Sequence, residues 1–193
     1  MQSCMNWLGP EELARHATFM RPRRQRQFLI GRILLRFAAG RLLGVDPASI
    51  MLTERKNDAP FLRNVPSSLG YSVSHSGPWV ACAVSRKVAL GLDVEMRDAS
   101  RDVMALAEAV FDTDECALLN AKEGMLQITA FYERWSMREA AFKLAARGYQ
   151  DGRHFSFFPH PKISMVLCSA QPLDETFFHD CTEEEGDGPF SVQ

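Results

Sequence analysis

Gly91-Leu92-Asp93-Val94-Glu95 closes an apolar run near the middle of the chain and is the most informative stretch of the sequence. Side chains on a β-strand alternate between two faces, so Leu92 and Val94 share one face while Asp93 and Glu95 share the other. Two carboxylates on one strand face can supply oxygen ligands to a hard cation such as Mg²⁺. We therefore predict a strand that carries a metal site, although alternation is also typical of a strand with one solvated face.

A second stretch, WSMREAAFK at 135–143, has the apolar spacing of a helix. Glu139 and Lys143 stand four residues apart in it, which places a carboxylate and an ammonium group on one helix face. Together with Asp93 and Glu95 they suit a site for magnesium and a diphosphate. Glu139 and Lys143 also have a purely structural interpretation, in which Glu139 is an exposed helix glutamate and Lys143 is its ion-pair partner.

The composition is that of one globular domain, or of two small halves that share a core. The chain has 193 residues, and 46% of them are hydrophobic, which is ample for burying a core. The 22 basic and 24 acidic side chains give a net charge of −2, so the chain as a whole offers no electrostatic case for binding nucleic acid. The charges are unevenly spread, because the segment between Glu12 and Asp46 has eight arginines and no acid, whereas no Lys or Arg follows Lys162.

The five cysteines favour a reducing compartment. Their number is odd and they form no CxxC pair, which argues against a disulfide framework and against a zinc site. No apolar run approaches the length of a membrane span, and residues 1–20 lack the uninterrupted apolar core of a signal peptide. We therefore expect a cytoplasmic protein with no membrane partner.

Hydrophobic periodicity predicts a mixture of helices and short strands. The longest predicted helix, over 23–43, is rich in arginine and ends at Gly44. The triplet at 85–87 predicts a hairpin turn between strands at 79–84 and 88–94. The other predicted elements are helices at 103–111, from 113 after an Asp112 capping box, and at 125–146, with strands at 50–54, 71–74 and 163–168.

The order of these motifs resembles that of the 4′-phosphopantetheinyl transferase superfamily, in particular the short bacterial members of its surfactin-synthetase-activating type. Each motif alone is weakly specific, but several in the same order and at similar spacing are a strong signal. The match spans residues 23–149. The motifs are GRILLR at 31–36, Pro60-Phe61, YSVSHSG at 71–77, GLDVE at 91–95, Phe111-x-x-x-Glu115 and WxxREAxxK at 135–143.

The resemblance implies an α+β fold made of two similar α/β halves, a pseudo-dimer with the active site in the cleft between them. We expect an N-terminal half at 1–90 with the arginine-rich helix and the Ser-His loop, and a C-terminal half at 91–193 with the acidic metal site and the catalytic helix. The two halves should form one compact unit. The acidic tail after about residue 170 is expected to be mobile at its end.

The resemblance also implies an activity. Such enzymes use Mg²⁺, with Mn²⁺ as an alternative, and transfer the 4′-phosphopantetheine arm of coenzyme A to a serine of an apo acyl or peptidyl carrier protein, releasing 3′,5′-ADP. By this resemblance the metal ligands are Asp93, Glu95 and Glu139. Glu139 is also the base, acting directly or through a metal-bound water, and Asp93 and Lys143 complete the catalytic set. We expect a monomer whose partners are coenzyme A and the carrier protein.

The coenzyme A site implied by the resemblance draws on both halves of the chain. Its expected members are Ser74, His75, Arg32, Arg36, Arg63 and Lys143. Arg24 and Arg26 could also contact the 3′-phosphate or the acidic carrier surface, but helical geometry cannot point all four helix arginines (24, 26, 32 and 36) at one cleft. We therefore expect at most half of these four to touch a ligand.

One departure from the family pattern concerns the nucleotide. The family often has Gly-Lys-Pro where this chain has Asp58-Ala59-Pro60, so a lysine that contacts the nucleotide is absent. Arg63 is our first choice for a replacement cation and Lys56 our second.

Two other function classes fit parts of the sequence. A non-catalytic module that binds coenzyme A or a carrier protein is one alternative, but the chain retains all three acids that such a degenerate copy could lose. A nucleic-acid-binding protein built on the arginine-rich helix is the other. The segment lacks a base-reading motif, and apolar residues fill most of that helix's other faces, so we expect no nucleic-acid partner.

Overall fold

The structure is a computed structural model of the 193-residue chain and describes residues 5–55, 59–150, 153–173, 179, 181–182 and 191–192. The prediction of a mobile acidic tail falls mainly on residues outside these ranges. Among the described helices, none is long and apolar enough to cross a membrane. The elements are α2 (Pro10–Ala17), α3 (Pro22–Leu43), the 3-10 helix η1 (Pro47–Ser49), β1 (Leu52–Thr53), β2 (Phe61–Leu62), β3 (Gly70–Ser76), β4 (Trp79–Ser85), β5 (Leu90–Met96), α4 (Val103–Val110), α5 (Thr113–Asn120), α6 (Gly124–Ala145), β6 (His154–Phe157), β7 (Ile163–Ser169), β8 (Cys181–Thr182) and β9 (Ser191–Val192).

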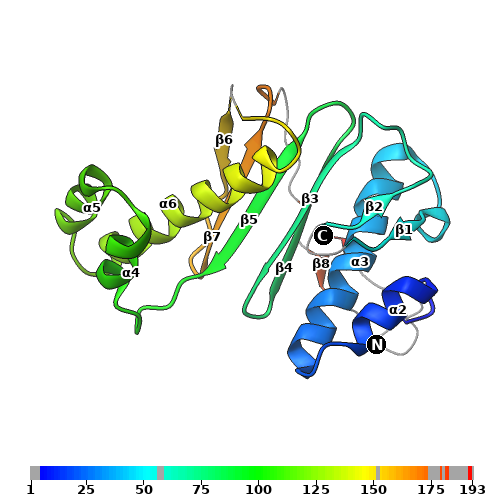
Figure 1. Cartoon of the computed structure of the whole chain (residues 1–193), viewed down its shortest axis with the longest axis horizontal. Coiled ribbons are helices and arrows are strands. Elements are labelled where there is room, and N and C mark those ends of the chain that lie inside the picture. The colour runs from blue at the N-terminus through cyan, green and yellow to red at the C-terminus, as the bar shows by residue number, and fades with distance from the viewer. Residues whose placement is uncertain are drawn as a thin grey trace.

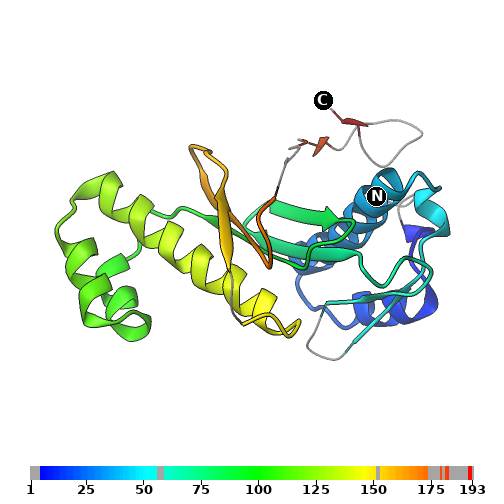
Figure 2. The ribbon, with the colours of Figure 1, turned by 90° about the horizontal axis from the view of Figure 1, so that it is seen from above.

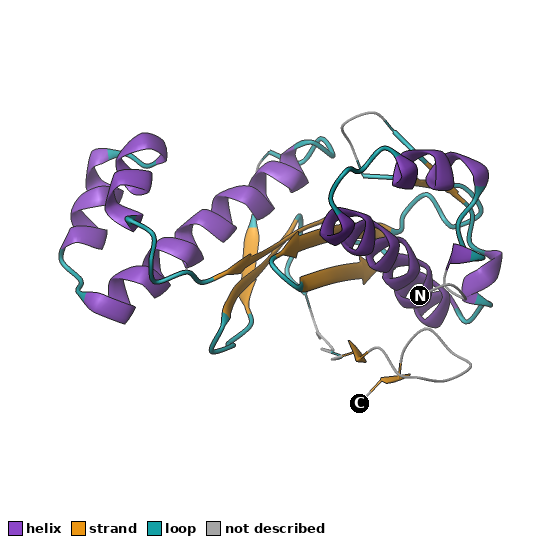
Figure 3. Ribbon diagram, turned by 90° about the horizontal axis from the view of Figure 1, so that it is seen from below, coloured by secondary structure: helices purple, strands orange, loops and turns teal. Residues whose placement is uncertain are grey.

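Two helix-on-sheet units meet in the middle of the molecule (Figure 1). Strands β3 and β4 form an antiparallel pair that packs on α3, and strands β5, β7 and β6 form an antiparallel sheet that packs on α6. The strands therefore gather between the two long helices (Figure 3). Helices α4 and α5 lie at one end of the molecule, far from α2 and α3 at the other (Figure 2). This arrangement confirms the predicted α+β fold, while the division at residue 90 remains a prediction.

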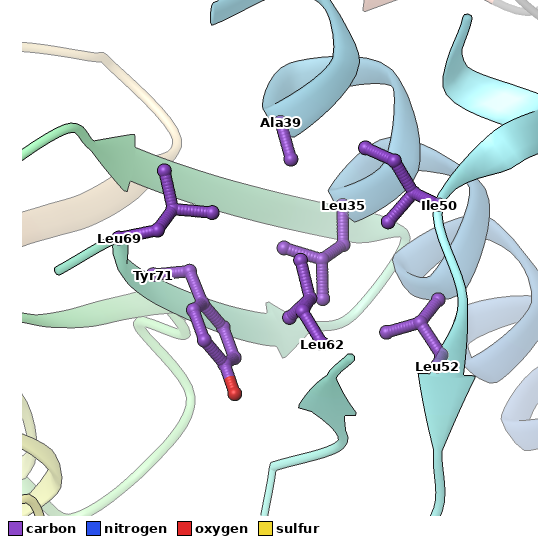
Figure 4. Close-up of a cluster of buried hydrophobic side chains, with 7 residues drawn as sticks. All are labelled: Leu35, Ala39, Ile50, Leu52, Leu62, Leu69 and Tyr71. Carbon is purple, nitrogen blue, oxygen red and sulfur yellow. The ribbon is translucent and has the colours of Figure 1, made fainter. Parts of the chain in front are cut away.

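The N-terminal unit has its own hydrophobic core. Side chains of α3 meet those of the short strands and of β3 (Figure 4). The Tyr71 hydroxyl at the edge of this core donates a 2.7 Å hydrogen bond to the Pro60 carbonyl, so the predicted Pro60-Phe61 turn is fastened to β3. The core residues are Leu35, Ala39, Ile50, Leu52, Leu62, Leu69 and Tyr71.

A second core joins the two sheets. Alternation along β5 sends Leu90, Leu92 and Val94 to one face, where they pack with apolar residues of β7. Partly buried Trp79, Ala81 and Ala83 of β4 pack against the same cluster. The β3–β4 pair therefore has one face on α3 and the other on β5. The acids of β5 lie on the opposite face, as the alternation in the sequence predicts. Helix α6 packs on that face.

Gly91 allows α6 to lie directly on β5. A Cβ atom at this position would stand 2.0 Å from the Ala140 carbonyl oxygen and 2.8 Å from the Leu144 nitrogen. Both are backbone atoms of α6, which cannot rotate out of the way. A side chain at residue 91 would therefore push the helix, and the functional groups on it, away from the acidic strand face.

The predicted hairpin between 79–84 and 88–94 is wrong. Strand β4 pairs with β3 through a two-residue turn at Gly77-Pro78, and β5 pairs with β7 instead. Gly77 has φ 58°, which a tight two-residue hairpin turn needs at its first central position. The triplet at 85–87 contains no glycine or asparagine to supply such a conformation, and the chain crosses there from one sheet to the other.

The long predicted helices and most predicted strands are confirmed. Helix α3 ends at Gly44, which has the left-handed φ of 74° that favours glycine. The Asp112–Glu115 capping box is present at the start of α5. The sequence patterns did not indicate α2, β2 or β6, which are eight, two and four residues long.

A buried ion-pair network fastens α2 and β1 to α3. The fully buried carboxylate of Glu12 accepts two hydrogen bonds from Arg36, at 2.9 and 2.6 Å. One turn earlier in α3, Arg32 donates two hydrogen bonds to Glu54, at 2.6 and 2.9 Å. Arg15 of α2 also reaches Glu54, at 3.3 Å. The arginines in the acid-free segment thus find their counter-ions just outside it.

We predict that replacing Gly91 by alanine destabilises the protein by at least about 1–3 kcal/mol, the range for overpacked cores, because the new methyl group would collide with α6 backbone. Gly31→Ala is the matched control. Its Cβ would make only ordinary contacts at 3.4 and 3.8 Å, inside a helix where alanine is preferred, so its free energy of unfolding should be equal or slightly higher. Urea denaturation measures both, and equal stability of the two variants would contradict the proposed contact.

The Glu12–Arg36 pair makes a second stability prediction. Glu12→Gln should lower the free energy of unfolding by about 3–5 kcal/mol, because it leaves the buried guanidinium of Arg36 without a counter-ion. The double variant Glu12→Leu/Arg36→Leu should lose less than the sum of its two single variants, since neither charge then remains buried alone. Strict additivity in denaturant titrations would show that the two side chains are not coupled.

Candidate active site

The acidic face of β5 is where the predicted site residues meet. Asp93 is 3% exposed, and its Oδ1 atom accepts hydrogen bonds from Lys143 Nζ at 2.8 Å and from Ser74 Oγ at 3.0 Å. The other carboxylate oxygen, Oδ2, is buried and has no hydrogen-bond partner among the described residues. A buried charged oxygen without a partner is costly, so this atom is the natural place for a cation to bind.

Lys143 crosses from α6 to β5. Its ammonium group donates to Asp93 Oδ1, to Ser74 Oγ at 3.0 Å and to the Leu92 carbonyl at 2.9 Å, which uses all three of its donors. The structural interpretation of Lys143 as the partner of Glu139 is therefore wrong. Glu139 is partly buried on α6, and its carboxylate makes no hydrogen bond or ion pair with any described residue.

Glu95 lies two residues further along the same strand face and accepts a 2.7 Å hydrogen bond from Ser76 Oγ. Burial raises the pKa of its carboxyl above the ordinary 4.5, and the neighbouring charge of Asp93 adds to the rise. The Ser76 hydrogen bond and the charges of Lys143 and Arg101 act against these effects on the pKa. A bound cation would relieve the repulsion between the two acids.

The two β5 acids fit a magnesium ion, whereas the predicted set of three acids is not gathered. In the part of the chain that the structure describes, no three His, Cys, Asp or Glu side chains are placed to hold a metal ion together. Mg²⁺ is commonly bound by one or two carboxylates, with substrate phosphates completing its shell. Asp93 and Glu95 provide such a pair of oxygen ligands, and Glu139 lies on α6, the helix that packs on β5.

Ser74 and His75 are neighbours in sequence but point to opposite sides of β3. Ser74 is buried against β5, whereas His75 lies at the surface beside Arg24 of α3, with its ring partly covered by neighbouring protein atoms. One Arg24 nitrogen contacts both ring nitrogens of His75, at 3.2 Å from Nδ1 and closer to Nε2. Desolvation of the ring and the Arg24 charge lower the pKa of His75 below 6.5. The His75–Arg24 pair is thus an electropositive spot with an uncharged imidazole at neutral pH.

Arg32 and Arg36 are not placed to bind coenzyme A. They are 8% and 3% exposed, and each donates two hydrogen bonds to a glutamate, as described above. The expectation that they hold the cofactor is corrected here, because their guanidinium groups stabilise the N-terminal unit. Arg24, near the start of the same helix, lies instead against His75.

Arg63, the expected replacement for the family lysine, follows directly after β2. It is exposed, and its side chain donates to Thr53 Oγ1 of the neighbouring strand. No contact among the described residues joins it to Ser74, His75 or Lys143. The second choice, Lys56, lies outside the described residues. Whether the turn at Ala59 faces coenzyme A thus remains a prediction.

The motif at 111–115 contacts the motif at 135–143, at a place away from Asp93 and Glu95. Glu115 of α5 accepts a 3.0 Å hydrogen bond from Arg134 and lies 3.7 Å from Arg138 on α6. Arg138 also donates to the Val110 carbonyl at the end of α4. These contacts fasten α4 and α5 to the helix that carries Glu139 and Lys143. Trp135 packs on this side with Phe131.

Sequence reasoning missed three side chains that build the site or support it. Glu12 could have been noticed as the last acid before the acid-free segment, and it neutralises Arg36. Ser72 and Ser76 flank Ser74 with a spacing of two, which places all three serines on one strand face. The signal for the serines was thus present in the sequence, but nothing in it indicated which strand they face.

We predict that the pKa of His75, measured by NMR titration of its ring signals, lies below 6.5. A lowered pKa means that the unfolded chain binds the proton more tightly, so His75 should lower stability as the pH falls below about 6.5. Arg24→Gln should raise this pKa only in part, because desolvation, the larger cause, remains. Lys143 and Asp93 act on it in opposite directions and remain in that variant. The His75→Gln variant assigns the signals, and a midpoint at or above 6.5 in the parent protein would contradict the prediction.

Comparison with known proteins agrees with the resemblance seen in the motifs. Residues 89–190, more than half of the chain, match the family model of the 4′-phosphopantetheinyl transferase superfamily, and residues 1–87 match that of the 4′-phosphopantetheinyl transferase N-terminal region. A 4′-phosphopantetheinyl transferase of Bacillus subtilis is 36% identical over 62% of this chain and 52% of its own length. The transferase HetI of Nostoc sp. is 31% identical over 77% of this chain and 63% of its own length.

The transferase Sfp of Bacillus subtilis strain 168 is 27% identical, and its alignment covers 87% of this chain and 84% of Sfp. The chain therefore spans between half and two thirds of the length of the first two relatives and most of the length of Sfp. The matches to the family models account for both units of the fold. The chain belongs to the 4′-phosphopantetheinyl transferase superfamily.

Proposed function

We propose that this protein transfers the 4′-phosphopantetheine arm of coenzyme A to a serine of an apo acyl or peptidyl carrier protein, in a Mg²⁺-dependent reaction that releases 3′,5′-ADP. The observation that carries the proposal is the hydrogen bond from Lys143 of α6 to Asp93, on the strand face that Asp93 shares with Glu95, next to an Asp93 oxygen that has no partner among the described residues. The names of the relatives support the class of reaction.

The metal site in this proposal consists of Asp93, through Oδ2, and Glu95. Mg²⁺, or Mn²⁺ in its place, would neutralise charge on the diphosphate of coenzyme A. Glu139 was expected as the third ligand, but it belongs to no three-acid group in the described chain. We therefore assign Glu139 to proton transfer rather than to the metal.

The reaction forms one phosphorus–oxygen bond and breaks another. The hydroxyl oxygen of the carrier serine attacks the phosphorus that bears pantetheine, the diphosphate linkage opens, and 3′,5′-ADP leaves with the electron pair. The serine proton goes to the carboxylate of Glu139. This carboxylate is suited to the role because no described hydrogen bond or ion pair engages it.

Two cationic groups are proposed to contact coenzyme A. The Lys143 side chain is 30% exposed. Its three donors are engaged by Asp93, Ser74 and the Leu92 carbonyl, so a phosphate of the donor would be attracted by its charge and would replace one of these hydrogen bonds on direct contact. Arg24, with His75 beside it, is the second group and would bind the 3′-phosphate by charge-assisted hydrogen bonds. Ser74 faces Asp93 instead of this spot, so we do not assign it to the nucleotide.

We also propose that the protein acts as a cytoplasmic monomer. Cys82, Cys116 and Cys168 are free thiols, which fits a reducing compartment. Light scattering coupled to size-exclusion chromatography tests the oligomeric state, and a mass well above 21.7 kDa would contradict a monomer.

The activity is tested by incubating the protein with coenzyme A, Mg²⁺ and a panel of apo carrier proteins, followed by intact-mass analysis of each carrier. We expect addition of the phosphopantetheine arm to at least one carrier, and no addition when Asp93→Asn replaces the parent protein. Binding of coenzyme A without transfer to any carrier would instead favour the non-catalytic module. Undiminished transfer by Asp93→Asn would refute the assignment of the site.

Glu139→Gln should lower kcat by about a hundredfold or more, the range typical of a lost general base, because the amide keeps the shape but cannot accept the serine proton. Coenzyme A affinity, measured by calorimetry, should change little. Glu133→Gln, on the same helix and also partly buried, is the matched control and should retain the parent kcat. A steady kcat combined with weaker Mn²⁺ binding would identify Glu139 as a metal ligand instead.

A further inference from the structure

Three serines of β3 form a ladder along β5. Ser72, Ser74 and Ser76 alternate along the strand, so their side chains share one face. Their hydroxyl oxygens accept hydrogen bonds from three backbone N–H groups of β5. The pairs are Leu92 to Ser72 at 2.8 Å, Val94 to Ser74 at 3.2 Å and Met96 to Ser76 at 3.0 Å.

Two of these hydroxyls have a second partner. Ser74 donates to Asp93 Oδ1 at 3.0 Å, and Ser76 donates to Glu95 Oε2 at 2.7 Å. A hydroxyl has one proton and two acceptor lone pairs, so each serine can accept from β5 and donate to a carboxylate at the same time. The same two side chains therefore connect the sheets and hold one oxygen of each acid.

Ser72 has no such second partner in the described part of the chain. Each serine accepts from the β5 residue that directly follows its neighbour on that strand. The neighbour of Ser74 is Asp93, that of Ser76 is Glu95, and that of Ser72 is Gly91. Gly91 has no side chain that could accept the proton. On β3, Ser74 and Ser76 each donate to a carboxylate, whereas Ser72 only accepts from β5. Substitutions of Ser72 therefore test the link between the sheets alone, and substitutions of Ser76 test the link together with the orientation of an acid.

We propose that Ser74 and Ser76 are positioning residues that orient Asp93 and Glu95 for a divalent cation. Each hydroxyl holds one carboxylate oxygen, so the direction of the remaining oxygen is determined before the ion arrives. Such outer hydrogen bonds fix the geometry of metal ligands and raise affinity. Through these bonds β3, in the N-terminal unit, sets the geometry of acids that belong to the C-terminal unit.

This inference gives the Ser-x-Ser-x-Ser pattern a role other than contact with the nucleotide. Ser74 is 6% exposed, and it is bonded to Val94, Asp93 and Lys143, so its hydroxyl is already fully used. Ser76 is the cleaner residue to test, because Lys143 does not contact it in the described structure. The inference rests on the metal site in the proposed function.

The test measures Mn²⁺ binding by electron paramagnetic resonance in the presence of coenzyme A, without carrier protein and therefore without turnover. We expect Ser76→Ala to raise the Kd for Mn²⁺ by about 10- to 100-fold, the usual effect of losing an outer hydrogen bond to a metal ligand. Ser76→Thr keeps the hydroxyl and should restore binding. Ser72→Ala removes only the link between the strands. Because the N–H group of Leu92 is buried and that of Met96 is exposed, Ser72→Ala should lower the melting temperature at least as much as Ser76→Ala, while leaving the Kd within about twofold of the parent value.

The outcomes separate this inference from the proposed function. If Asp93→Asn weakens Mn²⁺ binding but Ser76→Ala does not, the metal site stands and the positioning role is refuted. Equal weakening by Ser72→Ala and Ser76→Ala would also refute it, because the effect would then come from joining the sheets. If the parent protein binds no Mn²⁺, or Asp93→Asn binds it as well as the parent does, the metal assignment fails and this inference fails with it.

Discussion

The arrangement of the two sheets depends on the backbone N–H groups along the edge of β5 that faces β3. These groups have no partner strand in the β5–β7–β6 sheet and need other hydrogen-bond acceptors. The strand is buried between α6 and the β3–β4 pair, so an unpaired N–H group there would cost about 1–3 kcal/mol. Serine hydroxyls of β3 accept from Leu92, Val94 and Met96. The two sheets are thereby joined without a continuous backbone ladder, and the acids of one unit come to lie beside the hydroxyls of the other.

Charge balance around Asp93 explains how an acidic cluster can exist before a ligand binds. Lys143 neutralises one oxygen of this buried carboxylate at 2.8 Å, and Ser74 donates to the same oxygen. The second oxygen stays without a described partner, and burial raises the pKa of Glu95 close by. In the protein without a ligand, the ammonium group of Lys143 therefore stabilises the Asp93 carboxylate. The second oxygen of Asp93 stays available for a metal ion. Close packing of α6 on Gly91 keeps Lys143 within reach.

The arginines divide into two groups with different tasks. Arg32 and Arg36 are buried and bonded to Glu54 and Glu12, so they stabilise the packing of α2 and β1 on α3. Arg24, near the start of the same helix, lies beside His75. Spacing along the helix predicts which arginines share a face, but the burial of that face decides whether they bind a ligand or a glutamate. Arg32 and Arg36 of the basic segment thus contribute to stability.

Local patterns in the sequence determined the long helices, the capping box of α5 and the shared face of Asp93 and Glu95, because these features depend on residues only a few positions apart. The family could also be identified from the order of the motifs. Only the tertiary structure decided that β4 pairs with β3, that Lys143 bonds Asp93 rather than Glu139, and that Arg36 meets Glu12. The Lys143–Asp93 and Arg36–Glu12 contacts join segments distant in the chain, and β4 lies between two candidate partner strands in the sequence. Periodicity reports which face a side chain takes, but not which segment covers that face or pairs with that strand.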